Sequence, residues 1–141
     1  MFAKFASGAT EQDIHSFVVE WVGLLAAKNY QQAYESVLQS AYQGWTPDLM
    51  ESVVNGYGSP FQQGQLKYEV TNINEARGRG DGFGVMWLDE AAAKALGGQQ
   101  RLAEVRCQLP LNHVWSDLTV TFELLGDSDD LYLELADIHV S

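Results

Sequence analysis

The sequence predicts an α+β domain in which two or three N-terminal helices pack on a curved, mainly antiparallel sheet of four or five strands. Apolar residues recur every third or fourth position up to about residue 56, and every second position from about residue 66. A stretch at 56–60 that is rich in glycine and ends in proline separates these two patterns. We therefore expect a single domain over 1–141, with a helical part at about 10–56 and a sheet part at 66–140.

The helical part divides into three segments. The first expected helix covers 11–28, and Thr10 with Asp13 three residues later forms a capping box at its start. Its apolar stripe consists of Ile14, Phe17, Val18, Trp21, Val22 and Leu25. A second helix is expected from Tyr30 along a stripe that reaches Ala41, with Gly44 ending it. A third begins at the Thr46-Pro47-Asp48 sequence and runs to Gly56.

The sheet part begins with two alternating segments. The first covers 66–76, and the second covers 83–87 beyond a glycine-rich turn at 78–82. We expect these two to pair as a hairpin. The next segment, 89–96, is rich in helix formers and closes with glycines, so a helical turn or an ordered insertion is expected there.

Three further strands are expected. The segment 103–109 alternates up to Pro110, which has no N–H to donate to a sheet and marks the expected strand end. The segment 118–124 alternates most clearly of all, and the segment 131–140 also alternates. The turn at 126–130 lies between them, so they are expected to pair as an antiparallel hairpin.

The order of elements resembles that of the nuclear transport factor two-like, or cystatin-like cone, superfamily. The stripe at 14–25, the residues Asn29, Tyr30, Ala33 and Tyr34, and the closing hairpin carry this resemblance. The tail, WSDLT at 115–119 and DIHV at 137–140, is similar to small bacterial domains of unknown function. The resemblance implies a strongly bent sheet with a concave face. The superfamily includes enzymes, binding modules and non-catalytic partners, so the resemblance implies no activity.

The charge is strongly acidic and uneven. Eight Lys and Arg against 19 Asp and Glu give a net charge of −11, and no Lys or Arg follows Arg106. Nucleic acids and anionic membranes need a cationic surface, so we expect neither as a partner. A basic protein fits better. The expected acidic partner surface consists of Glu123, Asp127, Asp129, Asp130 and Glu134.

Cysteine content and apolar segments indicate the compartment. Cys107 is the only cysteine, which excludes an internal disulfide and a cysteine-based zinc site. It alternates on the core side of its strand, so a buried thiol is expected. No apolar stretch suits an export signal or a membrane span. We expect a cytoplasmic protein that needs neither metal nor cofactor.

Asp137 and His139 are the main candidates for chemistry. They stand two apart on the last expected strand, so their side chains should lie on one side of the sheet. The cone-fold resemblance implies that such a pair can transfer protons in a concave pocket. The alternative is an exposed histidine, or one satisfied by a neighbour. Asp117 is either a third member of this group or the acceptor of a local turn hydrogen bond.

Six aromatic residues have two interpretations. They either line a ligand pocket between helices and sheet, or plug the wide end of the cone as ordinary core. These residues are Tyr34, Tyr42, Trp45, Tyr57, Phe61 and Trp87.

Three functional hypotheses follow. The first is a non-catalytic acidic interaction module, of an immunity or adaptor type, that binds a basic protein. The second is a small-molecule-binding protein or enzyme that uses the concave aromatic pocket. The third is self-association as a homodimer through the open sheet face.

Overall fold

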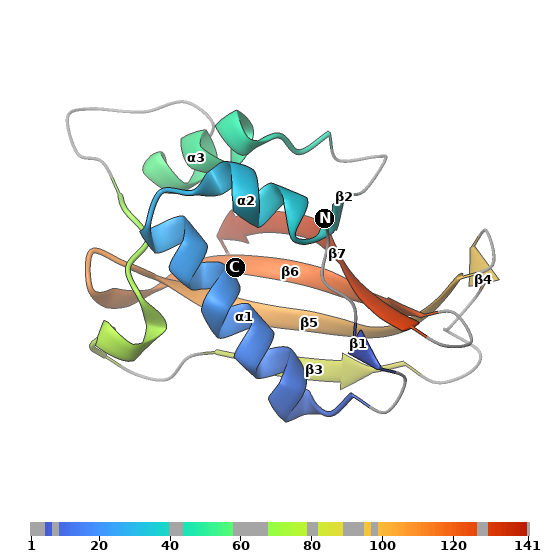
Figure 1. Ribbon diagram of the computed structural model, residues 1–141. Helices are drawn as coiled ribbons and strands as arrows, with labels where there is room; N and C mark the ends of the chain where they lie inside the picture. Colours follow the sequence, from blue (N-terminus) through green and yellow to red (C-terminus); the bar gives the residue numbers. More distant parts are fainter. Residues whose placement is uncertain are drawn as a thin grey trace.

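We analysed a computed structural model of the chain. The structure describes residues 5–6, 9–39, 44–57, 68–78, 82–88, 95–96, 99–126 and 130–140. Within these ranges three N-terminal helices pack on a mixed, mostly antiparallel sheet, which confirms the predicted α+β class (Figure 1). No described helix is both long and apolar enough to cross a membrane.

The first and third helices form where the sequence predicts them. Helix α1 spans Glu11–Ala26, α2 spans Tyr30–Glu35 and α3 spans Pro47–Asn55. The side chain of Thr46 accepts the Leu49 N–H and caps α3. A single 3-10 turn, η1, spans Ile73–Glu75.

The predicted capping box at the start of α1 is present. Thr10 Oγ1 accepts the Asp13 N–H at 3.3 Å, and Asp13 Oδ2 accepts the Thr10 N–H at 2.9 Å. Two N–H groups that have no partner inside the helix are thereby satisfied.

We expect Thr10→Ala to lower the free energy of unfolding by about 1 kcal/mol, because the Asp13 N–H loses its acceptor. Thr10→Ser keeps the hydroxyl and is the matched control. Urea unfolding of both variants measures the difference. If Thr10→Ala and Thr10→Ser unfold with the same free energy, the hydroxyl cap does not stabilise the protein.

The second helix is shorter than predicted. It ends at Glu35 rather than near Ala41, and strand β2, Leu38–Gln39, follows it. The Ser36 hydroxyl donates to the Gln32 carbonyl at 2.7 Å, and β2 then pairs in parallel with Glu134 and Leu135. The helical stripe beyond residue 35 was misread because pairing with a distant strand overrides local helix propensity.

Long strands form the C-terminal half. The described sheet has the order β1-β7-β6-β5-β3, with β2 also paired to β7 and β4 paired to β5. Their bounds are β1 Phe5–Ala6, β3 Gly84–Trp87, β4 Ala95–Leu96, β5 Gln99–Leu111, β6 Val114–Gly126 and β7 Asp130–Val140.

The predicted hairpin between 66–76 and 83–87 is wrong. Strand β3 pairs antiparallel with β5 instead, with Val85 opposite Val105. In the described range 68–78, Val70 makes only an isolated bridge to Leu111, Arg77 makes another to Val114, and η1 lies between them. Residues 66 and 67 lie outside the described residues, as does most of the predicted insertion at 89–96.

The closing hairpin is confirmed, and a second hairpin precedes it. Strands β6 and β7 pair from Leu118 opposite Val140 to Gly126 opposite Leu131. Strand β5 continues past Pro110 and pairs with β6 across Asn112 and His113, which both have positive φ. Two consecutive positive φ values are typical of the tight turns that match the twist of a hairpin.

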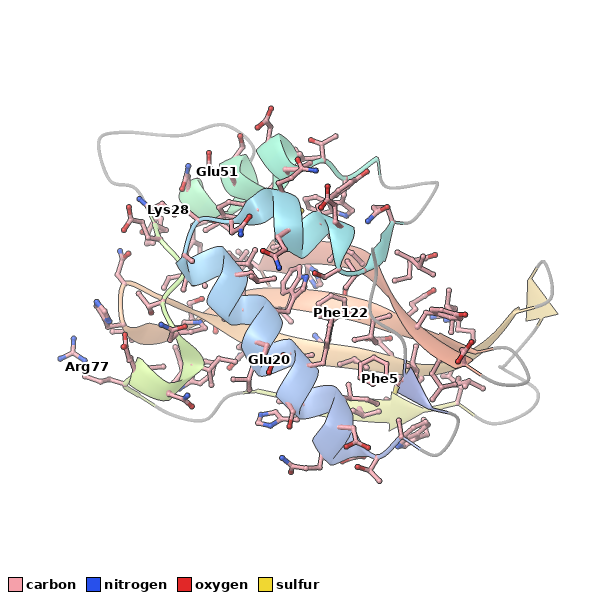
Figure 2. The ribbon with its side chains drawn as sticks, viewed as in Figure 1. Phe5, Glu20, Lys28, Glu51, Arg77 and Phe122 are labelled. Carbon is pink, nitrogen blue, oxygen red and sulfur yellow. The ribbon has the colours of Figure 1, made fainter. Side chains whose placement is uncertain are left out.

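The core lies between the helices and one face of the sheet. Ile14, Val18, Trp21, Val22 and Leu25 are buried, as the predicted stripe requires. They face alternate residues of β5, β6 and β7, and Figure 2 shows Phe122 beneath α1. Cys107 belongs to this buried set, as predicted.

Candidate functional site

The sheet face opposite the helices carries mainly polar side chains. Residues of β6 alternate, so Leu118, Val120 and Phe122 enter the core while Thr119, Thr121 and Glu123 lie on the other side, where the two threonines are nevertheless buried, at 2% and 8% exposed. No described helix packs on this side (Figure 1). We call it the open face, and define it by Glu104, Arg106, Gln108, Thr119, Thr121, Glu123, Glu134, Asp137 and His139.

Strand register places three glutamates in one line across the open face. Glu104 on β5 lies opposite Glu123 on β6, and Glu123 lies opposite Glu134 on β7. We call these three residues the glutamate row. Directly opposed side chains in antiparallel strands have Cβ atoms about 5 Å apart, and like charges there destabilise the sheet.

Two arginines offset part of this charge. Arg101 Nη2 lies 2.9 Å from Glu123 Oε1, whereas Arg106 Nε lies 3.9 Å from Glu104 Oε1. Glu134 has no ion pair among the described residues. Arg106 lies opposite Thr121, which lies opposite Asp137, so a second line of mixed charge runs beside the glutamate row.

Glu134 experiences this environment most strongly. Burial raises the pKa of its carboxyl group, the neighbouring charge of Glu123 raises it further, and Arg101 acts in the opposite direction. The raised pKa means that the ionised form is held in the folded protein at a cost in stability.

This raised pKa gives Glu134 an expected pH dependence. Above its unfolded value of 4.5, the native state keeps the proton longer than the unfolded state, so this group lowers stability as pH rises. Glu134→Gln should therefore gain stability over the wild type as pH rises from about 4 to about 7. Thermal unfolding of both proteins across that range measures the difference. A difference that shrinks with pH would contradict the raised pKa.

Two adjoining depressions lie on the open face. One, of about 450 Å³, lies over β3 and β5 and is lined by Met86, Arg106, Gln108 and other residues. The other, of about 330 Å³, is lined by Thr121, Asp137, His139 and other residues. Glu104 and Arg106 line both, so the two depressions adjoin along β5.

Asp137 and His139 lie together, as predicted from their spacing. His139 Nδ1 is 3.2 Å from Asp137 Oδ2, and both side chains line the 330 Å³ depression. Asp137 Oδ1 accepts the Ile138 N–H at 2.9 Å, which fixes the carboxylate. His139 Nδ1 is buried and makes no hydrogen bond within the described residues.

Asp117 does not join this pair. It does not line the 330 Å³ depression, and its backbone N–H donates to the Tyr57 hydroxyl at 3.3 Å. Its backbone carbonyl accepts a local hydrogen bond from the Thr119 hydroxyl at 3.1 Å, and its neighbour Ser116 makes two more hydrogen bonds here. The Ser116 hydroxyl accepts the Leu118 N–H at 3.2 Å and donates to the Leu109 carbonyl at 2.7 Å.

None of the described aromatic candidates lines either of the two depressions. Trp45 is buried in the core and donates to the Ala136 carbonyl at 3.2 Å, and Tyr34 packs against that core. Tyr57 contacts Tyr68 with the two rings tilted at 53°, while Trp87 is half-exposed on β3 and its indole N–H donates to Glu11 Oε1 at 3.4 Å. Tyr42 and Phe61 lie outside the described residues.

The five residues of the expected acidic surface do not form one surface within the described residues. Glu123 and Glu134 lie on the open face, and Asp130 lies at the start of β7, where it accepts the Tyr132 hydroxyl at 3.4 Å. Asp127 and Asp129 lie outside the described residues. Sequence reasoning missed Glu104, because only the register of β5 on β6 brings it beside Glu123.

Within the described residues, no group of three or more His, Cys, Asp or Glu side chains is placed to hold a metal ion. Comparison with protein-family models, with curated proteins and with solved structures finds no match to this chain. The resemblance to the nuclear transport factor two-like superfamily stays a prediction from the sequence.

Proposed function

We propose that this protein is a non-catalytic binding module that holds a basic segment of a partner protein on the open face. The observation that carries the proposal is the glutamate row, which is formed by cross-strand register between Glu104, Glu123 and Glu134. A flexible surface tolerates scattered charges, but these three carboxylates are held side by side by strand pairing.

The energetics favour a cationic partner. Four carboxylates on this side of the sheet, the glutamate row and Asp137, face two guanidinium groups, Arg101 and Arg106. An arginine of a partner can bond a carboxylate through two parallel N–H groups, and such charge-assisted bonds are about twice as strong as neutral ones. Binding would also relieve the repulsion within the row.

The charge of the whole chain supports the same partner. A net charge of −11 attracts a basic molecule at long range and speeds its approach. It opposes the third hypothesis, a homodimer through the sheet, because two copies placed face to face would bring two glutamate rows together. The strand register therefore favours a basic protein over a second copy.

Calorimetric titration with a hexa-arginine peptide tests the proposal. We expect saturable binding at about 0.05 M salt that weakens at least tenfold at about 0.3 M, because salt screens exposed charges. A serine-glycine peptide of equal length is the control and should not bind. Absence of binding at the lower salt concentration would contradict the proposal.

A second candidate function is small-molecule binding in the 330 Å³ depression. The contact between His139 and Asp137 favours it, since a paired imidazole beside Arg106 offers both a proton carrier and an anion contact. Native mass spectrometry of the purified protein should then show a co-purifying small molecule that His139→Ala loses. A ligand retained by His139→Ala would remove the histidine from this function.

A further inference from the structure

A separate cavity lies on the helical side of the molecule. It has a volume of about 130 Å³ and lies where α1 ends, beside α3 and the segment that leads to η1. Its polar lining consists of Lys28, Tyr30, Glu51, Asn55 and Glu69. Figure 2 shows Lys28 and Glu51 at this place, and none of these residues belongs to the open face.

Tyr30 is the unusual member of this lining. Its side chain belongs to the core and is only 7% exposed, and its hydroxyl makes no hydrogen bond to another described residue. The residue lines the cavity, so the hydroxyl is left to meet whatever occupies that space. Burial raises the pKa of Tyr30, and the charges of Glu51 and Glu69 raise it further, so the group stays a neutral hydroxyl.

The electrostatics of the cavity favour a positive ligand. Lys28 Nζ lies 2.8 Å from Glu69 Oε1 and so offsets one carboxylate. The second carboxylate, that of Glu51, has no ion pair or hydrogen bond within the described part of the chain. Helices α1 and α3 both end here, at Ala26 and Asn55, and the C-terminal end of a helix carries partial negative charge.

We propose that this cavity binds a small primary ammonium compound, with Glu51 holding its charge. A primary ammonium has three N–H donors and no acceptor. Residues that line the cavity carry matching acceptors, among them the Glu51 carboxylate, the Tyr30 hydroxyl and the Asn55 side-chain amide. A volume of about 130 Å³ is more than one water molecule needs and leaves room for an amine with a short carbon chain.

Lys28 limits this affinity. Its ammonium group already lies in the same cavity, so a bound ligand experiences repulsion from it. Lys28→Met keeps the length of the side chain and removes the charge. We expect this variant to bind the amine more tightly than the wild type does.

Titration with ethylammonium chloride, followed by backbone amide NMR, tests the site. We expect saturable shifts confined to residues near Tyr30, Glu51 and Asn55. Tetramethylammonium chloride has the same charge but no N–H donor, and should cause no such shifts. Potassium chloride at the same concentration is the control for salt.

Variants distinguish binding at this cavity from a general attraction of the cation to the acidic protein. Glu51→Gln is expected to weaken binding about tenfold, because it removes one charge-assisted hydrogen bond. Tyr30→Phe is expected to weaken binding about threefold or more, because it removes the hydroxyl. Glu20→Gln removes an exposed carboxylate elsewhere on α1 and should leave the affinity unchanged. Glu51 is exposed, so its variant should fold even if Tyr30→Phe does not.

Three outcomes would each overturn the proposal. The first is the absence of saturable shifts in the wild type. The second is equal weakening of binding by Glu51→Gln and Glu20→Gln. The third is that tetramethylammonium causes the same shifts as ethylammonium. None of these outcomes affects the test of peptide binding on the open face, because the two sites share no residue.

Discussion

Trp21→Ala is expected to lower the free energy of unfolding by about 3–5 kcal/mol, the largest effect of any single change considered for this chain. Trp21 is 1% exposed, and its ring meets that of Phe122 edge to face with centroids 5.0 Å apart. Its indole N–H donates to the Ala33 carbonyl at 2.9 Å. One side chain therefore joins α1 to α2 and to the centre of β6, and its removal leaves a cavity at their junction.

Trp87→Ala is the matched control, since it removes the same side chain from a position that is 48% exposed. We expect it to cost less than about 1 kcal/mol. Urea denaturation of both variants measures the two values. Equal costs would mean that the helices are not held on the sheet through Trp21. Trp21→Phe should fall between the two, because it keeps ring packing but leaves the Ala33 carbonyl without the indole donor.

The second large effect concerns binding. The triple variant Glu104→Gln, Glu123→Gln and Glu134→Gln is expected to weaken hexa-arginine binding about 100-fold, equivalent to roughly 2.7 kcal/mol. Each substitution keeps the size of the side chain and removes one charge from the glutamate row. The same variant should be no less stable than the wild type, because it removes repulsion between opposed like charges.

A control with equal charge separates the row from net charge. Glu20, Glu35 and Glu75 are exposed and lie outside the sheet, so their triple replacement by glutamine changes the net charge by the same amount. We expect this control to weaken peptide binding less than about threefold, since distant exposed charges are largely screened. Similar losses in both triple variants would show that the peptide senses the total charge and not the row.

Local sequence patterns were sufficient for much of the fold. The apolar stripe of α1, the Thr46-Pro47 start of α3 and the alternation of β6 and β7 each involve neighbours within a few residues. The end of α2 and the partner of β3 were wrong for the opposite reason. Parallel pairing of β2 with β7, and pairing of β3 with β5, join segments far apart in the chain, and no local pattern encodes them.

The candidate site shows the same division. Asp137 and His139 were correctly placed on one side of the sheet, because a spacing of two along a strand is a local property. Glu104 was missed because its place opposite Glu123 depends on the register between β5 and β6. The tight turn at Asn112 and His113 and the bulges in the β5–β6 pairing determine that register. Which residues of one strand share a face can be predicted from the sequence. Which residues lie side by side across several strands depends on the pairing register, which the sequence pattern does not give.

The most direct test of the binding proposal is to map the peptide on the protein. Hexa-arginine titrated into isotopically labelled protein should shift the amide signals of β5, β6 and β7 around Glu104, Glu123 and Glu134, and leave those of α1 and α3 in place. Such a pattern would assign binding to the glutamate row. Shifts centred on the helices, or spread evenly over all acidic residues, would contradict a binding site on the open face.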